Sequence, residues 1–338
     1  MKRTTLTLLL LAVSTALLFA LSMTTGAVNI PTSDVLAIML GRGTSNHTWH
    51  FIVTETRLPS AVTAMMAGSS LAVSGLLLQT AFRNPLAGPG IFGISSGASV
   101  GVALVMLALG GELSAGAFSV GGFMAVLAGA FAGAMAVTAV IFAFSTMVRS
   151  SVVLLIIGVM IGYLASSAVT LLNFHASEEG VRSYVTWGMG TFGNTSSHQT
   201  AAMSGLALVG LALAAMLVKP LNAFLLGSQY ARNLGINTRL FRHLLLVITG
   251  WLTAVATAFC GPIAFIGLAV PHIARLLLSS EDHRWLLPCT MLCGMAVALL
   301  CHVICTAASG GSMIPVNAVT PIIGAPVIIY CLCSNRFR

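Results

Sequence analysis

The sequence predicts an all-α, polytopic membrane protein whose residues 1–338 form a single transmembrane domain. Hydrophobic residues occupy 57% of the positions and charged residues only 7%, a composition far outside that of a soluble globular domain. The few charges separate apolar runs that exceed the ~20 residues a helix needs to cross a bilayer. Because the backbone polar groups of a segment in lipid must be hydrogen-bonded internally, we expect these runs to be helices.

Eight charge-free runs mark the expected spans. They cover residues 4–33, 58–82, 84–111, 113–148, 150–177, 183–218, 243–274 and 285–335. Gly261-Pro262 should break the seventh run into a full span and a shorter span, and Ser309-Gly310-Gly311 should divide the last run, because Gly and Pro interrupt helices. The sequence therefore predicts about ten transmembrane helices.

The distribution of basic residues predicts the orientation. Ten spans place both termini on one side, and that side receives twelve of the fifteen Lys and Arg residues. The other three are Arg42, Arg57 and Arg182. Since basic residues concentrate on the cytoplasmic side, we expect both termini there. The net charge of +8 then reflects topology and anionic lipid, and a nucleic-acid partner is not expected.

The first apolar run could be a secretory signal or a retained span. It is long and lacks an obvious small-x-small cleavage site before Pro31, so we expect it to be retained. All seven cysteines follow position 259. Packing is the default interpretation for such small residues, with a disulfide or metal site as the alternative. Four-residue spacing predicts close helix approach at three glycine pairs: Gly97/Gly101, Gly129/Gly133 and Gly158/Gly162.

The longest inward loop, about 219–242, has the length and pattern of two short helices split at Gly235. A short amphipathic element at the cytoplasmic surface can fill a groove on a soluble partner, with Leu225, Leu226 and Leu234 as apolar contacts. A basic loop that rests on lipid headgroups explains the same pattern equally well.

Several sequence blocks occur in a fixed order along the chain. They are Arg57-Leu58-Pro59, Gly75 to Gln79, Arg83-Asn84-Pro85-Leu86-Ala87, Gly93 to Ala98, Gly261 to Leu268, Pro271 to Leu276, Asp282-His283-Arg284 and Gly324-Ala325-Pro326. Together they closely resemble the FecCD family, the ten-helix permeases of type II ABC importers for iron-siderophores, haem and vitamin B12. The resemblance covers essentially the whole chain and does not select a substrate.

This resemblance implies a permease subunit of an ATP-driven importer, which carries a ferric siderophore, haem or cobalamin across the bacterial cytoplasmic (inner) membrane. The implied partners are a second permease copy, commonly forming a homodimer, two cytoplasmic ABC ATPase subunits and a periplasmic or lipid-anchored substrate-binding protein. The chain has no Gly-x-x-x-x-Gly-Lys-Ser/Thr loop, so ATP and Mg are expected on the ATPase. No enzymatic activity, cofactor or metal is expected in this chain itself.

The resemblance also assigns cytoplasmic roles. Coupling helices that contact the ATPase would include Leu226, Gly227, Ser228, Ala231, Arg232, Leu234 and Gly235. The family often has an acidic residue at the position of Ser228. Ser150 and Ser151 match the position of a cytoplasmic gate, although serine is also common at helix starts for capping alone.

On the outer face, family permeases use arginines to meet acidic residues of the binding protein. Arg57 is the first candidate, followed by Arg42 and Arg182. The family commonly has an Asp and, four residues later, an Arg toward the outer end of the ninth span, where this chain has His302 and Thr306. Docking on that side therefore differs from the family pattern.

Five residues are candidates for lining the pathway: Asn173, His175, Trp187, Met189 and His302. Trp187 could instead be an interfacial anchor. His302 lies beside Cys301 and near Cys305, and imidazole and thiolate both bind iron or zinc. Three residues on one helix rarely complete such a site, so we expect no metal there.

Two other functional classes fit less well. An ion-coupled secondary transporter of a small solute would place titratable groups at mid-membrane, where this chain has very few. An intramembrane enzyme would need a catalytic constellation, and no His-Glu-x-x-His motif occurs.

Overall fold

The computed structural model describes residues 2–42, 46–108, 120–148, 150–307 and 314–333, and these residues form helices joined by turns, with no strand among them. Seven helical stretches in the described residues have the length and apolar composition to cross a membrane. They contain α1 (Lys2–Thr24), α4 (Leu58–Phe82), α7 (Val120–Met147), α8 (Ser151–His175), α10 (Ser197–Met216), α13 (Thr238–Cys260) and α15 (His283–Ala307).

Three shorter apolar helices complete the bundle. They are α5 (Ile94–Ala103), which continues into η2 (Leu104–Ala108), α14 (Ile266–Leu278) and α16 (Val316–Cys333). Seven long and three short apolar helices in the described part of the chain agree with the ten that the charge pattern predicts. The all-α, multi-pass architecture is confirmed.

The first predicted interruption of the apolar runs separates two helices. Helix α13 ends at Cys260 because Gly261 has a φ of +75° and Pro262 has no backbone N–H to donate. Helix α14 then starts after Phe265, whose φ is +67°. The second interruption, at 309–311, lies outside the described residues, between the end of α15 and the start of α16.

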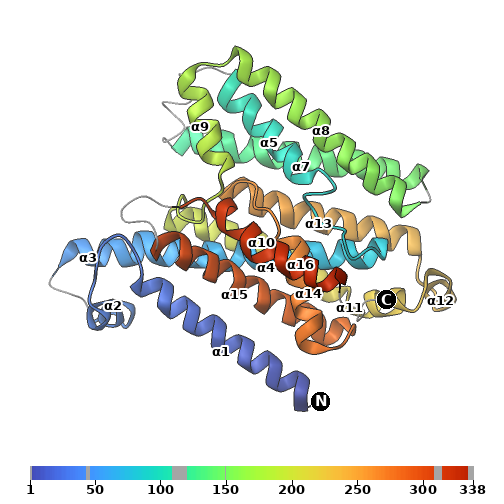
Figure 1. Ribbon diagram of the computed structural model, residues 1–338, viewed down its shortest axis with the longest axis horizontal. Helices are drawn as coiled ribbons and strands as arrows, with labels where there is room; N and C mark the ends of the chain where they lie inside the picture. Colours follow the sequence, from blue (N-terminus) through green and yellow to red (C-terminus); the bar gives the residue numbers. More distant parts are fainter. Residues whose placement is uncertain (1, 43–45, 109–119, 149, 308–313, 334–338) are drawn as a thin grey trace.

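Helix α4 lies at the centre of the bundle, and almost all of its side chains are buried. Helices α10, α13, α14 and α15 pack around it, while α5, α7 and α8 form a neighbouring group (Figure 1). The helix backbones come into direct contact where glycines face each other. A Cβ added to Gly75 would overlap the carbonyl oxygen of Gly267, and one added to Gly68 would overlap that of Gly294.

The predicted close approach is present for two of the three glycine pairs. A Cβ on Gly97 would overlap the carbonyl oxygen of Gly133, and a Cβ on Gly101 would overlap that of Gly129. Helices α5 and α7 therefore meet backbone to backbone, as small residues at four-residue spacing permit. In the third pair, a Cβ on Gly158 would overlap the backbone of Phe92, whereas one on Gly162 would meet only Ser96 Oγ at 3.7 Å.

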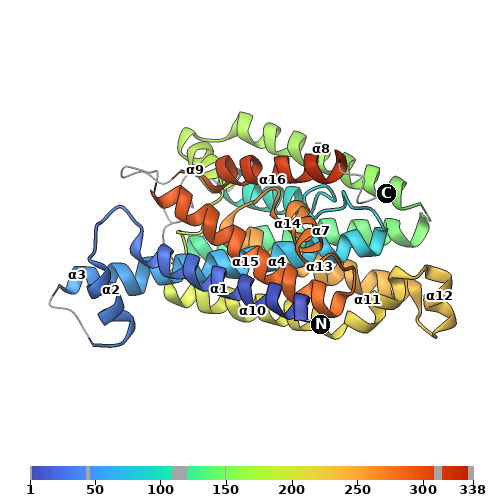
Figure 2. The same cartoon turned by 60° about the horizontal axis from the view of Figure 1, so that its bottom comes forward.

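Short helices lie at the two ends of the molecule (Figure 2). One end carries α2 (Thr32–Met39), α3 (His47–Phe51), η1 (Ile52–Arg57) and α9 (Glu178–Gly188), and the other carries α11 (Val218–Leu225) and α12 (Ser228–Asn233). The predicted pair of short helices in the 219–242 loop exists, but its boundary at Gly235 is wrong. Gly227 separates α11 from α12, and Gly235 ends the turn that leads into α13.

Candidate functional site

Residues 218–237, which we call the surface segment, comprise α11, α12 and the turns that follow each. Leu221 and Phe224 of α11 and Ala231 of α12 are fully or almost fully buried. Leu226 and Leu234 are 68% and 58% exposed. The segment is therefore anchored to the bundle by one set of apolar side chains and leaves another set uncovered, which is the arrangement that a partner groove requires.

Two glycines give the surface segment its shape. Gly227 has a φ of +126° and Gly235 a φ of +81°, a region that side chains other than glycine rarely occupy. Arg83 supports the first of these turns. Its guanidinium Nη2 donates a 2.7 Å hydrogen bond to the carbonyl oxygen of Phe224. The guanidinium carbon lies over the ring of the same residue, 5.6 Å from the ring centroid.

The seven predicted coupling residues thus divide into three groups. Leu226, Arg232 and Leu234 are exposed, and they can contact a partner directly. Ala231 is buried against the chain's own helices. A large side chain at Ala231 would displace α12, so the expectation that this residue itself meets the partner is corrected to a packing role. Gly227, Ser228 and Gly235 form the turns and the start of α12.

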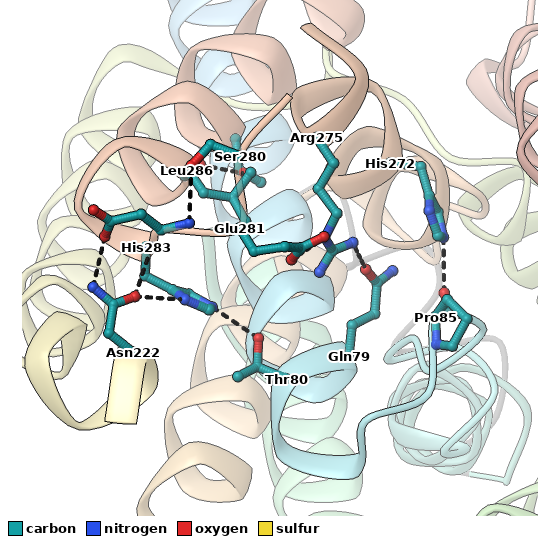
Figure 3. A network of polar contacts seen from close by, with 12 residues as sticks. Gln79, Thr80, Pro85, Asn222, His272, Arg275, Ser280, Glu281, His283 and Leu286 are labelled. Carbon is teal, nitrogen blue, oxygen red and sulfur yellow. Dashed lines mark hydrogen bonds and ion pairs between the residues drawn. The ribbon is translucent and has the colours of Figure 1, made fainter. Parts of the chain in front are cut away.

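Directly beneath the surface segment lies a polar network that joins it to the bundle (Figure 3). The Asn222 amide Nδ2 donates to Asp282 Oδ1 at 2.6 Å. Its oxygen Oδ1 accepts from the backbone N–H of His283 at 2.8 Å and lies 3.1 Å from Nδ1 of the same residue. The other ring nitrogen of His283 lies 2.9 Å from the Thr80 hydroxyl. Three helices, α11, α15 and α4, therefore share one set of hydrogen bonds.

A second set of contacts ties α14 to α4 on the other side of the same region (Figure 3). Arg275 donates to Gln79 Oε1 and forms a 3.1 Å ion pair with Glu281. The ring Nε2 of His272 donates to the carbonyl oxygen of Pro85 at 2.8 Å. These residues line a cavity of ≈ 290 Å³ between the end of α4 and the surface segment.

The two predicted gate residues lie in the turn before α8. Ser150 is exposed and accepts a 3.4 Å hydrogen bond from the backbone N–H of Val153, so it caps the helix. Ser151 is the first residue of α8, and its side chain lies outside the described residues. The capping contact exists, and a gating role stays a prediction.

At the opposite end, Arg57 does not have the exposure expected of a docking residue. Its side chain is 6% exposed. The guanidinium Nη1 donates to the carbonyl oxygens of Met23 and Thr24, at 2.7 and 3.1 Å, and Nη2 donates to that of Val28. Arg57 thereby satisfies two carbonyls that the end of α1 leaves without intrahelical partners, and a third in the segment that follows α1. The remaining candidates for docking are Arg42 and Arg182, which are both exposed.

The structure does not bring the five predicted pathway residues into one site. Asn173 and His175 lie at the end of α8, half-buried and exposed respectively. Trp187 is half-buried in α9, and Met189 follows that helix with 44% exposure. These four residues lie at the end of α8 and in or just after α9. That they line the entrance to the transport pathway stays a prediction.

His302 lies inside the bundle, on α15. It is 4% exposed, and its ring packs against the ring of Phe192 in a T-shaped arrangement, with ring centroids 6.1 Å apart. Cys301 and Cys305 are also buried. In the described part of the chain, no group of three or more His, Cys, Asp and Glu side chains is placed to hold a metal ion.

Sequence reasoning missed two asparagines that organise the ends of the molecule. Asn222 joins the surface segment to α15, as described above. Asn317 of α16 donates to the carbonyl oxygens of Gly188 and Pro262 and accepts from the N–H of Ala264. Helix-breaking residues near both sites could have signalled backbone groups in need of partners, but nothing in the sequence identifies which side chain supplies them.

Comparison with known proteins gives consistent results. The model of the FecCD transport family matches residues 13–334. The vitamin B12 import system permease protein BtuC of Citrobacter koseri is 36% identical over 284 residues, covering 84% of this chain and 83% of that protein. BtuC of Klebsiella pneumoniae is 35% identical, with the same coverage. A solved structure, described as an inward-facing conformation of a putative metal-chelate type ABC transporter, superposes with a TM-score of 0.82 at 28% identity and covers 96% of this chain and 97% of that chain.

Proposed function

Because the chain belongs to the FecCD transport family, and is therefore a permease subunit of an ABC transporter, we propose that it carries a large metal chelate inward across the bacterial cytoplasmic membrane. Cobalamin is the first candidate, and a ferric siderophore or haem is the alternative within the same class. Permeases of this family are not enzymes themselves, and ATP is hydrolysed by a separate subunit. The proposal extends that assignment to the cargo, the direction and the mechanism.

The observation that carries the mechanism is the surface segment with its polar attachment to α15 and, through His283, to α4. Its exposed Leu226 and Leu234 can seat in an ATPase subunit, while Asn222 and Arg83 hold the segment to the bundle. Closure of two ATPase subunits on ATP would then move the segment, and the packed helices would follow as rigid bodies. In this proposal, force enters the bundle through these contacts.

The orientation follows from the same arrangement. The ATPase is cytoplasmic in this mechanism, so the end that carries α11 and α12 faces the cytoplasm, together with both termini. Arg83, Arg232, Arg275 and Arg284 belong to this end, in accordance with the positive-inside rule. The exposed Arg42 and Arg182 then face the binding protein on the other side.

A second copy of the chain would complete the pathway. Helix α8 lies at the edge of the molecule (Figure 1), and it exposes large apolar side chains, including Leu164, Leu171 and Phe174 at 70%, 66% and 83%. We place the pathway between two such copies, with Ser150 and Ser151 at its cytoplasmic end. Apolar spans with few fixed charges suit a wide passage that holds a bulky chelate only weakly.

Uptake into proteoliposomes tests the cargo. The permease is reconstituted with its ATPase and its binding protein, and accumulation of cobalamin, haem and a ferric siderophore is compared at equal concentration with ATP inside. We expect one of the three to accumulate, with cobalamin first. If none accumulates in a complex that contains all subunits and hydrolyses ATP, the metal-chelate proposal is wrong.

A further inference from the structure

The Asn222 side chain is oriented by the groups around it. Its Nδ2 lies 2.6 Å from Asp282 Oδ1, which can only accept a hydrogen bond from it when ionised. Its Oδ1 lies 2.8 Å from the backbone N–H of His283, which can only donate. Turning the amide over would place donor against donor and acceptor against acceptor. The nitrogen and the oxygen of the amide are therefore both hydrogen-bonded to residues at the start of α15.

The chain of contacts continues through His283 into α4. Since Asn222 Oδ1 only accepts, the His283 Nδ1 at 3.1 Å carries a hydrogen and donates it. In the neutral ring, Nε2 then accepts from the Thr80 hydroxyl at 2.9 Å. His283 is fully buried and Thr80 is 4% exposed, so water does not compete freely for these bonds. We call these four residues, Asn222, Asp282, His283 and Thr80, the Asn222 clamp.

The clamp differs in kind from the apolar contacts of the surface segment with the bundle, and the hydrogen bond from Arg83 to the Phe224 carbonyl is a second polar attachment. Leu221 and Phe224 pack against the bundle through apolar surface, and apolar contact has no preferred direction. Hydrogen bonds fix distance and angle. Asp282 also accepts from the N–H of Arg284 at 2.9 Å, so the carboxylate holds the first turn of α15 as well as Asn222. Displacement of α11 must therefore displace the start of α15.

We propose that Asn222 is the positioning residue that transmits movement of the surface segment into α15 and α4. This inference rests on the proposed function, because it concerns how ATP-driven movement reaches the pathway. Helix α15 packs against α1, α4, α14 and α16. Movement of its first turn consequently spreads through much of the bundle, including the central helix.

The ratio of ligand imported to ATP hydrolysed tests the clamp. Asn222→Leu removes the amide at similar size, and Thr80→Val removes the hydroxyl. We expect each variant to assemble with the ATPase and hydrolyse ATP, and Asn222→Leu to import about tenfold less ligand per ATP, within the usual range of coupling between two sites. Thr290→Val is the matched control, because the buried Thr290 hydroxyl bonds only to Leu286 of its own helix in the contacts described.

A reciprocal exchange distinguishes transmission from general stability. Asn222→Asp alone sets two carboxylates against each other. Combined with Asp282→Asn, it restores one donor between the two positions and keeps an acceptor for His283. We expect the single variant to lose coupling and the double variant to recover it, with equal thermal unfolding temperatures for the double variant and the wild type.

Three results would overturn the proposal. They are an unchanged import ratio in Asn222→Leu, an equal loss in Thr290→Val, or no recovery in the exchange pair while the complex remains assembled. Failure of the wild-type complex to import any ligand is a different outcome, since it contradicts the proposed function itself. Import by the wild type together with unaltered coupling in all clamp variants rejects only the role of Asn222.

Discussion

The imidazole Nε2 of His283 lies 2.9 Å from the hydroxyl of Thr80, although 203 positions separate the two residues. This contact joins the first turn of α15 to the last turn of α4, directly beneath α11. The same end of the molecule also holds Arg275, Gln79 and Arg83 in polar contacts. Polar side chains therefore fix the end of the bundle where the surface segment is attached, while glycine backbones fix its middle.

The close approach of α4 and α14 predicts a strong effect of one methyl group. In Gly75→Ala the new Cβ would overlap the carbonyl oxygen of Gly267, so the two helices must separate. We expect the free energy of unfolding in detergent to fall by about 1–3 kcal/mol or more, as for other overpacked cores.

Gly205→Ala is the matched control for this change. A Cβ at Gly205 of α10 meets no atom within 4 Å, and alanine favours helix by up to about 1 kcal/mol over glycine. We expect this variant to be as stable as the wild type or slightly more stable. Equal tolerance of the two substitutions would contradict the packing described here.

Arg57 should contribute to stability rather than to docking. Arg57→Leu would leave the buried carbonyl of Met23, and those of Thr24 and Val28, without their donor. Loss of hydrogen bonds to a charged group predicts a decrease of about 3 kcal/mol in the free energy of unfolding. Arg42→Leu, at an exposed position, should change stability by less than about 0.5 kcal/mol. A stable Arg57→Leu variant that fails to bind the binding protein would reverse this assignment.

Arg42 and Arg182 should govern the rate of association with the binding protein. Arg42→Glu and Arg182→Glu reverse exposed charges, and such changes act mainly on the association rate and its salt dependence. We expect association to be about tenfold slower at low salt, with the difference shrinking as salt is added. Arg284→Glu, at the other end of the molecule, serves as the control. Identical association rates for all three variants would place the docking surface elsewhere.

Leu226 and Leu234 should bind the ATPase. Truncation of a buried interface residue typically costs about 1–2 kcal/mol, so Leu226→Ala and Leu234→Ala are each expected to raise the Kd for the ATPase about five- to thirtyfold. Gln229→Ala, a change at an exposed position of α12 between the two leucines, should have little effect. If the two leucine variants bind the ATPase normally and instead bind anionic vesicles less well, the segment rests on lipid headgroups.

The helix pattern was predictable from the sequence because it depends on local signals. Charges end the apolar runs, and Gly261-Pro262 ends α13 through a positive φ and a missing N–H. The small residues at Gly97 and Gly129 identify faces that can approach closely. These signals act within one helix or between helices with matching faces, so one sequence suffices to detect them.

The polar contacts were not predictable in the same way. Asn222, His283 and Thr80 come from three helices, and no spacing in the sequence shows that their side chains meet. The burial of Arg57 depends on carbonyl oxygens at the end of α1, more than twenty residues earlier. The boundary at Gly227 was missed because both Gly227 and Gly235 permit a turn, and packing of Ala231 decides where α12 lies.

In the proposed mechanism, a separate ATPase powers import through this chain by acting on the surface segment. The most direct measurement is ligand uptake into proteoliposomes that contain the permease, the binding protein and either an active or a catalytically inactive ATPase, each with and without ionophores. We predict that uptake requires the active ATPase and is unaffected by ionophores. Uptake that persists with the inactive ATPase and is abolished by ionophores would contradict the account and indicate ion-coupled transport.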